Sequence, residues 1–116
     1  MTEPTAPFVV RALAPTVSVI EIEGELTRDS ENALHDAYAR VSDSARTIIL
    51  AFDRLTYMNS SGIGLLVALL VRAKRNNQRI LAYGLTGHYR QIFELTHLDQ
   101  AIAIHDTQDA ALAAIA

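Results

Sequence analysis

Segments that resemble β-strands alternate with segments that resemble α-helices along this chain, and this alternation most narrowly limits its fold. Residues 8–13 and 17–22 are rich in β-branched and apolar residues and are separated by a turn at Pro15 and Thr16. We therefore expect these two strands to pair as a hairpin. Further strands are expected at residues 47–52, 79–84 and 101–104.

Four segments after the hairpin have the signature of helices, because apolar residues recur every three or four positions or good capping residues begin them. They cover residues 27–43, about 61–76, 86–98 and 106–116. The resulting order is β-β-α-β-α-β-α-β-α. Strands that alternate with helices favour a mostly parallel sheet with helices packed on it. We predict an α/β fold with a mixed, mostly parallel sheet of about five strands and four helices.

The length of 116 residues favours one domain, which we place at residues 8–116. Residues 1–7 are polar and contain proline, so we expect a flexible arm rather than a signal peptide. The longest apolar stretch, residues 63–71, is far shorter than the roughly 18 residues that a membrane-spanning helix needs. We therefore expect a cytoplasmic protein without direct membrane insertion, as a monomer or a weak dimer.

Composition excludes several classes of chemistry. The absence of cysteine rules out disulfides, zinc–thiolate sites and thiol catalysis. The four histidines lie in different predicted elements without ligand-like spacing, so we expect no metal and no cofactor. A net charge of −3 without an evident basic face disfavours nucleic-acid binding. The segment MNSSG lacks the first glycine of the nucleophile elbow Gly-x-Ser-x-Gly, and we do not expect an enzyme.

Two adjacent serines stand at the start of an almost wholly apolar helix in the segment YMNSSGIGLLVALL. Asn59, Ser60 and Ser61 are all suitable N-cap residues, although one cap is enough. Gly62 and Gly64 each cost about 1 kcal/mol relative to alanine inside a helix. These features indicate that another surface or a phosphate approaches the first turn, where free N–H groups and the helix dipole favour an anion. Phosphorylation there would add roughly two negative charges.

The apolar helix is expected to bury one side and to present another. We expect Leu65, Leu66, Leu69 and Leu70 in the core. The opening turn is expected to face outward as part of a docking surface formed by Met58, Ser60, Ser61, Ile63 and Gly64. The alternative is that the serines only cap the helix and the apolar run only fills the core. The cations in the last turns, Arg72, Lys74 and Arg75, complement the helix dipole, and docking of an acidic partner is a second role that we consider.

The same segment resembles a known signature. YMNSSGIGLL is similar to the motif Asp-Ser-Ser/Thr-Gly-Leu-Gly that follows a strand in STAS-domain anti-sigma factor antagonists. VIEIEGEL resembles the family's second strand and turn, TIILAFDRLTYMNSSG its strand–loop–serine segment, and HYRQIFELTHLDQAIAI its third helix and last strand. The resemblance extends from about residue 8 to residue 115 and implies a STAS fold, in agreement with the order of elements above.

The resemblance also implies a function. In this family the domain binds a serine kinase that doubles as an anti-sigma factor, and so releases a sigma factor. Phosphorylation of the first serine ends the capture, and a serine phosphatase restores it. By position, Ser60 is then the phosphoacceptor, and Ser61 is a cap or a secondary acceptor. The implied partner-binding site comprises Thr27, Met58, Asn59, Ser60, Ser61, Gly62, Ile63 and Gly64.

Two positions depart from the family pattern. Asn59 stands where the family has an acidic residue before the serine, and Thr27 stands where an aspartate often closes a Gly-Glu-Leu-Asp turn. Without these carboxylates a phosphate on Ser60 meets less repulsion. The alternative is a divergent STAS interaction module without a phospho-switch, such as an accessory subunit of a lipid-transport ABC complex or a stress-signalling scaffold. A small enzyme or nucleotide-binding domain is a third, more distant alternative.

Overall fold

The computed structural model describes residues 8–115, so the arm expected at residues 1–7 lies outside the described part of the chain. The strands are β1 (Val9–Ala14), β2 (Val17–Glu21), β3 (Gly24–Leu26), β4 (Thr47–Ala51), β5 (Leu55–Met58), β6 (Arg79–Tyr83) and β7 (Ala103–His105). The α-helices are α1 (Glu31–Ala39), α2 (Ser60–Arg75), α3 (Gly87–Leu95) and α4 (Gln108–Ala113). Two short 3₁₀ turns, η1 (Arg28–Ser30) and η2 (Leu98–Gln100), join them.

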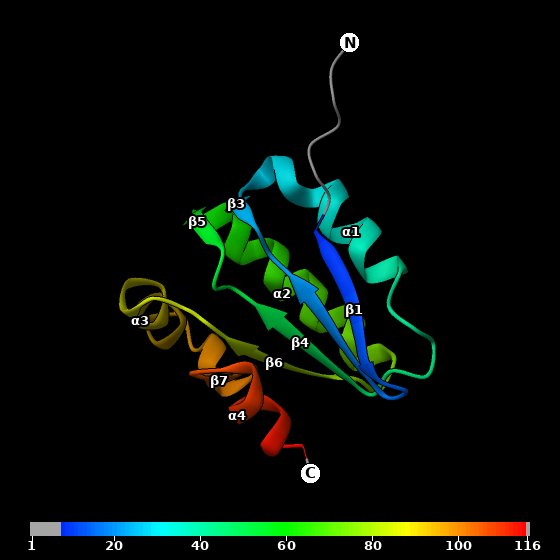
Figure 1. Cartoon of the computed structure of the whole chain (residues 1–116). Coiled ribbons are helices and arrows are strands. Elements are labelled where there is room, and N and C mark those ends of the chain that lie inside the picture. Colours follow the sequence, from blue (N-terminus) through cyan, green and yellow to red (C-terminus); the bar gives the residue numbers. More distant parts are fainter. Residues whose placement is uncertain (1–7, 116) are drawn as a thin grey trace.

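Five strands form the main sheet in the order β1-β2-β4-β6-β7 (Figure 1). β1 and β2 pair antiparallel as the expected hairpin, whereas every later neighbouring pair is parallel. The predicted α/β fold, with a mixed, mostly parallel five-stranded sheet and four helices, is confirmed.

Helices cover both faces of this sheet. In Figure 1, α2 runs behind the strands and α4 lies in front of them. The larger core lies on the α2 side, where Leu66 packs with side chains such as Ile20 and Leu50. The smaller core lies under α4, where Ala111 packs with Ile49. All five residues of β4 are buried, as the uninterrupted apolar run predicts for a strand covered on both faces.

β3 and β5 form a separate two-stranded parallel sheet, which is not among the strands expected from the sequence. Gly24 starts β3 with a φ of 77°, a left-handed conformation that glycine adopts without strain. Leu26 lies opposite Met58, so the two strands end side by side. This pair carries the chain from the main sheet to the start of α2 and thereby positions the twin serines.

Several element ends differ from the prediction. α1 begins at Glu31 rather than at residue 27, because residues 27–30 form a capped 3₁₀ turn. α4 is shorter than expected and begins after Thr107, whose side chain accepts a hydrogen bond from the backbone N–H of Ala110 at 3.1 Å. Within residues 8–115, no helix combines the length and hydropathy that crossing a membrane requires.

Candidate functional site

Asn59 is the N-cap of α2. Its Oδ1 accepts a hydrogen bond from the backbone N–H of Gly62 at 3.1 Å, and its backbone carbonyl accepts one from Ile63 at 3.0 Å. The cap is therefore supplied without either serine, which contradicts the expectation that Ser61 could serve as the cap. Both hydroxyls remain available for another role.

Ser60 and Ser61 are both exposed in the first turn of α2. The first N–H groups of a helix lack intrahelical acceptors, and they form the positive end of the helix dipole. The first turn of α2 contains no acidic residue. The hydroxyl of Ser60 thus lies where a negative charge would be stabilised by the helix and would meet no carboxylate from its own turn.

The two glycines of the segment have different surroundings. A Cβ on Gly62 would lie 2.1 Å from the backbone oxygen of Leu26, so only glycine lets α2 approach the end of β3 this closely. Gly62 is buried, and its prediction as a partner-contact residue is wrong because β3 already covers it. A Cβ on Gly64 would meet nothing within 4 Å, and this exposed position stays a candidate contact.

Thr27 and Asn59 follow the paired ends of β3 and β5. The backbone N–H of Asn59 donates to the carbonyl of Leu26 at 3.4 Å, so the residue after Leu26 is a neighbour of the α2 cap. The side chain of Thr27 accepts a hydrogen bond from the backbone N–H of Asp29 at 3.3 Å and is half-buried. Its hydroxyl therefore caps η1, and the two positions that depart from the family pattern lie close together.

Met58 does not face outward as predicted, because it is only 5% exposed. Its side chain packs in the larger core, and its backbone N–H donates to the Tyr89 hydroxyl at 3.0 Å. It also contributes to a mostly apolar groove of 260 Å³ between the start of α2 and the end of α3. The lining residues are Met58, Asn59, Ser60, Ile63, Ile92 and Thr96.

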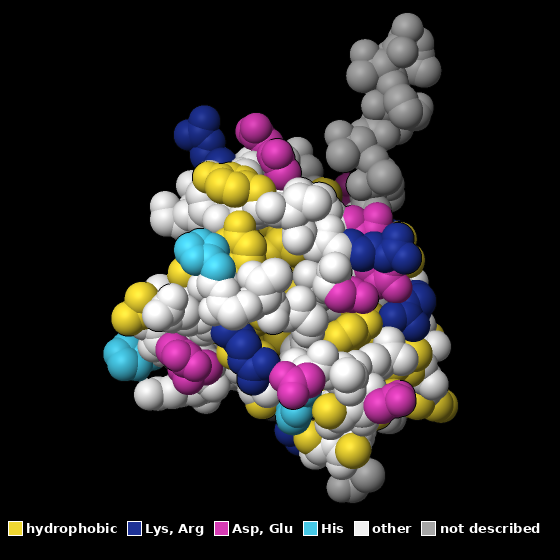
Figure 2. Space-filling model, turned by 60° about the vertical axis from the view of Figure 1, so that its left-hand side comes forward, with side chains coloured by type: hydrophobic (Ala, Val, Ile, Leu, Met, Phe, Trp, Pro, Cys, Tyr) yellow, Lys and Arg dark blue, Asp and Glu magenta, His cyan; other side chains and the backbone are white. Residues whose placement is uncertain are grey.

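α3 supplies one wall of this groove, although the site predicted from the sequence contains no residue of this helix. Only Phe93 of this helix is buried, while Ile92 is partly buried and Leu95 is 75% exposed. Figure 2 looks onto this side of the molecule, where hydrophobic side chains appear between polar and charged ones. The sequence of α3 contains a sign of this surface. Ile92, Phe93 and Leu95 are all apolar but cannot all face the sheet from one helix, so some of them must remain uncovered.

The remaining outer surface of α2 is also apolar. Leu66 and Leu69 are buried as predicted, but Leu65 and Leu70 are only partly buried. Val67 and Val71 are 43% and 45% exposed. They lie one and two turns after Gly64 on the same side of the helix, so an apolar strip extends from the serines along α2.

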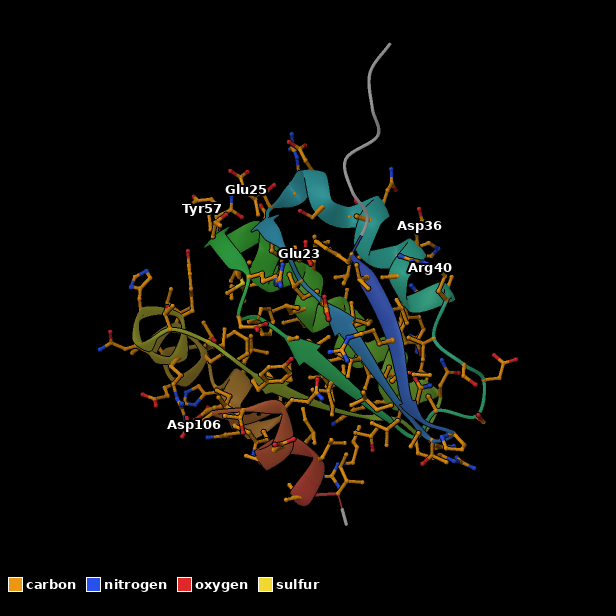
Figure 3. All side chains as sticks on the ribbon, in the orientation of Figure 1. Glu23, Glu25, Asp36, Arg40, Tyr57 and Asp106 are labelled. Carbon is orange, nitrogen blue, oxygen red and sulfur yellow. The ribbon has the colours of Figure 1, made fainter. Side chains whose placement is uncertain are left out.

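Tyr57 and Glu25 lie beside this site at the tips of β5 and β3. They are register partners, and Figure 3 shows both side chains directed away from the body of the molecule. Tyr57 is 48% exposed. The pair adds an aromatic and an acidic side chain next to the start of α2.

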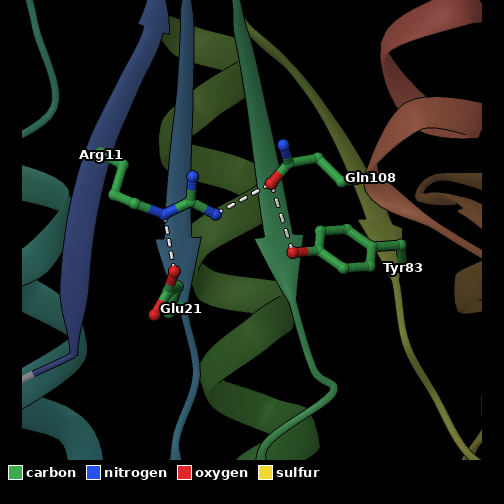
Figure 4. A network of polar contacts seen from close by, with 4 residues as sticks. All are labelled: Arg11, Glu21, Tyr83 and Gln108. Atoms are coloured by element: carbon green, nitrogen blue, oxygen red, sulfur yellow. Dashed lines mark hydrogen bonds and ion pairs between the residues drawn. The ribbon is translucent and has the colours of Figure 1, made fainter.

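A polar network lies on the opposite face of the sheet (Figure 4). Arg11 forms an ion pair with Glu21 at 2.6 Å and donates to Gln108 Oε1 at 2.8 Å, and Tyr83 donates to the same oxygen at 3.4 Å. Burial, together with the charge of Asp53, raises the pKa of Tyr83 above its usual value. This network attaches α4 to the sheet. Within residues 8–115, no three side chains of His, Cys, Asp or Glu form a group that could hold a metal.

Comparison with known families agrees with this architecture. A family model described as "Mlab, STAS domain" matches residues 9–106. The chain belongs to the STAS domain family. The recognition made from the serine motif is therefore confirmed at the level of this family.

The relatives include a putative transporter and an anti-sigma factor antagonist. The chain is 28% identical over 95 residues to the "Putative sulfate transporter YvdB" of Bacillus subtilis, covering 81% of this chain and 18% of that protein. It is 24% identical over 88 residues to the "Anti-sigma-B factor antagonist" of Staphylococcus aureus, covering 75% of this chain and 82% of that protein. The chain thus spans less than a fifth of the transporter but most of the antagonist.

Solved structures of the Bacillus protein SpoIIAA have the same fold. The unphosphorylated anti-sigma factor antagonist is 22% identical, with a TM-score of 0.72 and coverage of 93% of this chain and 96% of that chain. The phosphorylated form is also 22% identical and has a TM-score of 0.67, with coverage of 94% and 99%. At this identity the likeness concerns the fold alone.

Proposed function

We propose that this STAS protein is a non-catalytic regulator of the anti-sigma factor antagonist type, switched by phosphorylation of Ser60. In its unphosphorylated state it binds a serine kinase that acts as an anti-sigma factor in the cytoplasm, and so releases a sigma factor. A serine phosphatase restores the binding state. One observation carries this proposal: Asn59 caps α2, which leaves the Ser60 hydroxyl exposed at the rim of an apolar groove.

The groove gives the switch a physical basis. An apolar partner side chain that fills the space between Ile63 and Ile92 would be stabilised by the apolar surface that it buries. A phosphate on Ser60 would place a strongly hydrated dianion at the rim of that contact. Burial of such a charge beside an apolar group is costly, so the phosphorylated protein would release the partner.

The N-terminal end of α2 favours a phosphate on Ser60, against the charge of Glu25, which lies beside this end. The phosphate would lie at the positive end of the sixteen-residue helix α2, whose first turn lacks acidic residues. Asn59 keeps the capping hydrogen bond that an aspartate would make, without its negative charge. We therefore infer that Asn59 and Thr27 tune the switch and do not abolish it. SpoIIAA, which has the same fold, is described in an unphosphorylated and a phosphorylated form, and we propose a switch of that type here.

The proposal can be tested with serine kinases of the anti-sigma type from the source organism, each purified and titrated with this protein. Binding should be lost in Ser60→Asp and retained in Ser61→Asp, which carries the same charge one residue away. Kinase treatment should modify the parent protein and not Ser60→Ala. Equal binding by the parent and Ser60→Asp would contradict the proposal.

A second candidate is a STAS interaction module without a phospho-switch, such as an accessory subunit of a transport complex. The similarity to part of a putative sulfate transporter and the absence of the acidic residue at position 59 favour it. Such a module would keep a stable partner through the same groove and would bind it equally well with Ser60→Asp. The titrations above therefore separate the two candidates.

A further inference from the structure

Four cationic side chains gather at the end of the molecule that lies farthest from Ser60. Lys74 and Arg75 end α2, and the chain then reverses through Asn77, which has a φ of 57°. Arg79 follows at the start of β6, where its backbone N–H donates to the carbonyl of Arg46 at 2.9 Å. The fold therefore brings Arg46, Lys74, Arg75 and Arg79 together, and we call this group the basic end. The basic end is not evident in the sequence because these residues are separated by up to 33 positions.

The four side chains of the basic end are exposed and are not used by the fold. Within residues 8–115, the ion pairs formed are Arg11–Glu21 and Arg90–Asp106, and neither involves the basic end. Two other cations differ in this respect. Arg40 donates to the carbonyl of Phe8 at 2.6 Å, and Arg72 lies over the Tyr38 ring at 4.6 Å. The basic end thus retains its full charge for an external partner.

The opposite end of the molecule is predominantly acidic. Figure 3 shows Glu25 beside Tyr57 near the tips of β3 and β5, and Glu23 at the base of β3. Glu31 and the exposed Asp29 and Asp53 lie at the same end, with Arg28 and Arg54 as the cations among them. α2 joins the two ends, and its sixteen residues span about 24 Å at the usual helical rise. One acidic side chain, the exposed Asp43, lies near the basic end, where it lines a hollow with Asn76 and Gln78. Cations outnumber it there, so the charges of the molecule are polarised along this helix.

We propose that the basic end binds the surface of an anionic phospholipid membrane peripherally, with the Ser60 end directed away from the lipid. Clusters of Lys and Arg contribute about 1 kcal/mol per residue to such binding. A polarised molecule is oriented by an extended plane of charge, which attracts its basic end and repels its acidic end. A short acidic peptide would not use that polarity, and single-stranded nucleic acid would need exposed aromatic side chains for stacking, whereas the exposed Tyr57 lies at the other end.

This orientation has a consequence for the Ser60 site. At physiological ionic strength the screening length is about 8 Å, much shorter than α2. A phosphate on Ser60 would therefore leave membrane binding unchanged, and the groove would stay accessible to a protein partner. Membrane binding at the basic end is independent of the proposed phospho-switch, so either can fail without the other.

The test is co-sedimentation of the full chain with vesicles of phosphatidylcholine alone or mixed equally with phosphatidylglycerol. At about 20 mM NaCl, where screening is weak, we expect binding to the mixed vesicles only, with loss at about 0.5 M NaCl. Arg46→Glu/Arg79→Glu should lower the partition coefficient about 30-fold or more. The matched control, Arg28→Glu/Arg54→Glu, changes the net charge equally at the acidic end and should retain binding.

Folding of each variant is checked by circular dichroism, and Lys74→Gln/Arg75→Gln provides a second test that leaves both strand starts unaltered. This variant should also weaken vesicle binding, again by about 30-fold. Absence of binding at low salt, equal binding to neutral vesicles, or equal losses in the two double charge reversals would overturn the proposal. Binding of a polyglutamate peptide without binding of anionic vesicles would also overturn it and would assign the basic end to an acidic polypeptide.

Discussion

The hydroxyl of Tyr89 accepts a hydrogen bond from the backbone N–H of Met58 at 3.0 Å, and this contact ties α3 to the start of α2. Met58 is the last residue of β5 and immediately precedes the cap Asn59. The hydroxyl therefore satisfies a polar group beside the apolar groove and fixes the chain that presents Ser60. Tyr89 is a positioning residue for the candidate site, although it does not line the groove itself.

Replacement of Tyr89 by phenylalanine should lower the free energy of unfolding by about 1 kcal/mol, because the N–H of Met58 loses its acceptor. Urea denaturation measures this change, and hydrogen exchange should show faster exchange of the Met58 amide in particular. Tyr57→Phe is the control, since the side chain of Tyr57 is 48% exposed and should contribute little. Unchanged protection of the Met58 amide would show that the hydrogen bond is dispensable.

The capping assignment predicts different effects for three adjacent residues. Asn59→Ala should destabilise the protein by about 1 kcal/mol, because the N–H of Gly62 loses its acceptor. Ser60→Ala and Ser61→Ala should each change stability by less than about 0.5 kcal/mol, since neither hydroxyl caps the helix. Thermal unfolding of the three variants measures these effects. A loss for Ser60→Ala as large as that for Asn59→Ala would contradict the assignment.

The two glycines of α2 should respond in opposite directions to the same substitution. Gly62→Ala should destabilise by about 2 kcal/mol or more, because the added methyl group would overlap the carbonyl of Leu26 and force the helix away from β3. Gly64→Ala should stabilise by up to about 1 kcal/mol, because the new methyl group has open space and alanine favours the helix. Denaturant titrations of both variants provide the comparison, and changes of equal sign would refute this account of the segment.

Tyr83 should make stability fall at alkaline pH. Its pKa is raised in the folded protein, mainly by burial, so the folded state keeps the proton at pH values where the unfolded state releases it. The free energy of unfolding therefore decreases as the pH rises above the unfolded value of 10.0. Deprotonation also removes the donor to Gln108. Stability measured between about pH 8 and 11 should depend less steeply on pH in Tyr83→Phe than in the parent; parallel curves would exclude this role.

The sequence predicts the main sheet well because each of its strands after the hairpin is an apolar run bounded by helical segments. It does not predict β3 and β5, which have only three and four residues. These strands are too short to show an alternating apolar pattern, and they form because they pair with each other. Capping propensity does not separate Asn59 from Ser60, because both residue types cap helices; the close contact of Gly62 with Leu26 fixes where α2 starts.

The groove and the basic end depend on tertiary structure in the same way. Ile92 and Phe93 are adjacent apolar residues of α3, and the sequence alone does not show which of them the sheet covers. The proximity of Met58 to Ser60 in the sequence predicts that it faces outward, yet strand alternation directs its side chain into the core. Arg46 and Arg79 become neighbours only when β4 and β6 pair.

The central claim is that the exposed hydroxyl of Ser60 is a phosphorylation switch. Phosphosite mapping by mass spectrometry, on the protein isolated from its own cells during growth and under stress, tests this claim most directly. We predict phosphate on Ser60 at an occupancy that changes with condition, with little or none on Ser61. Ser60 found unmodified under every condition, with full coverage of its peptide, would contradict the account and would favour the interaction module without a switch.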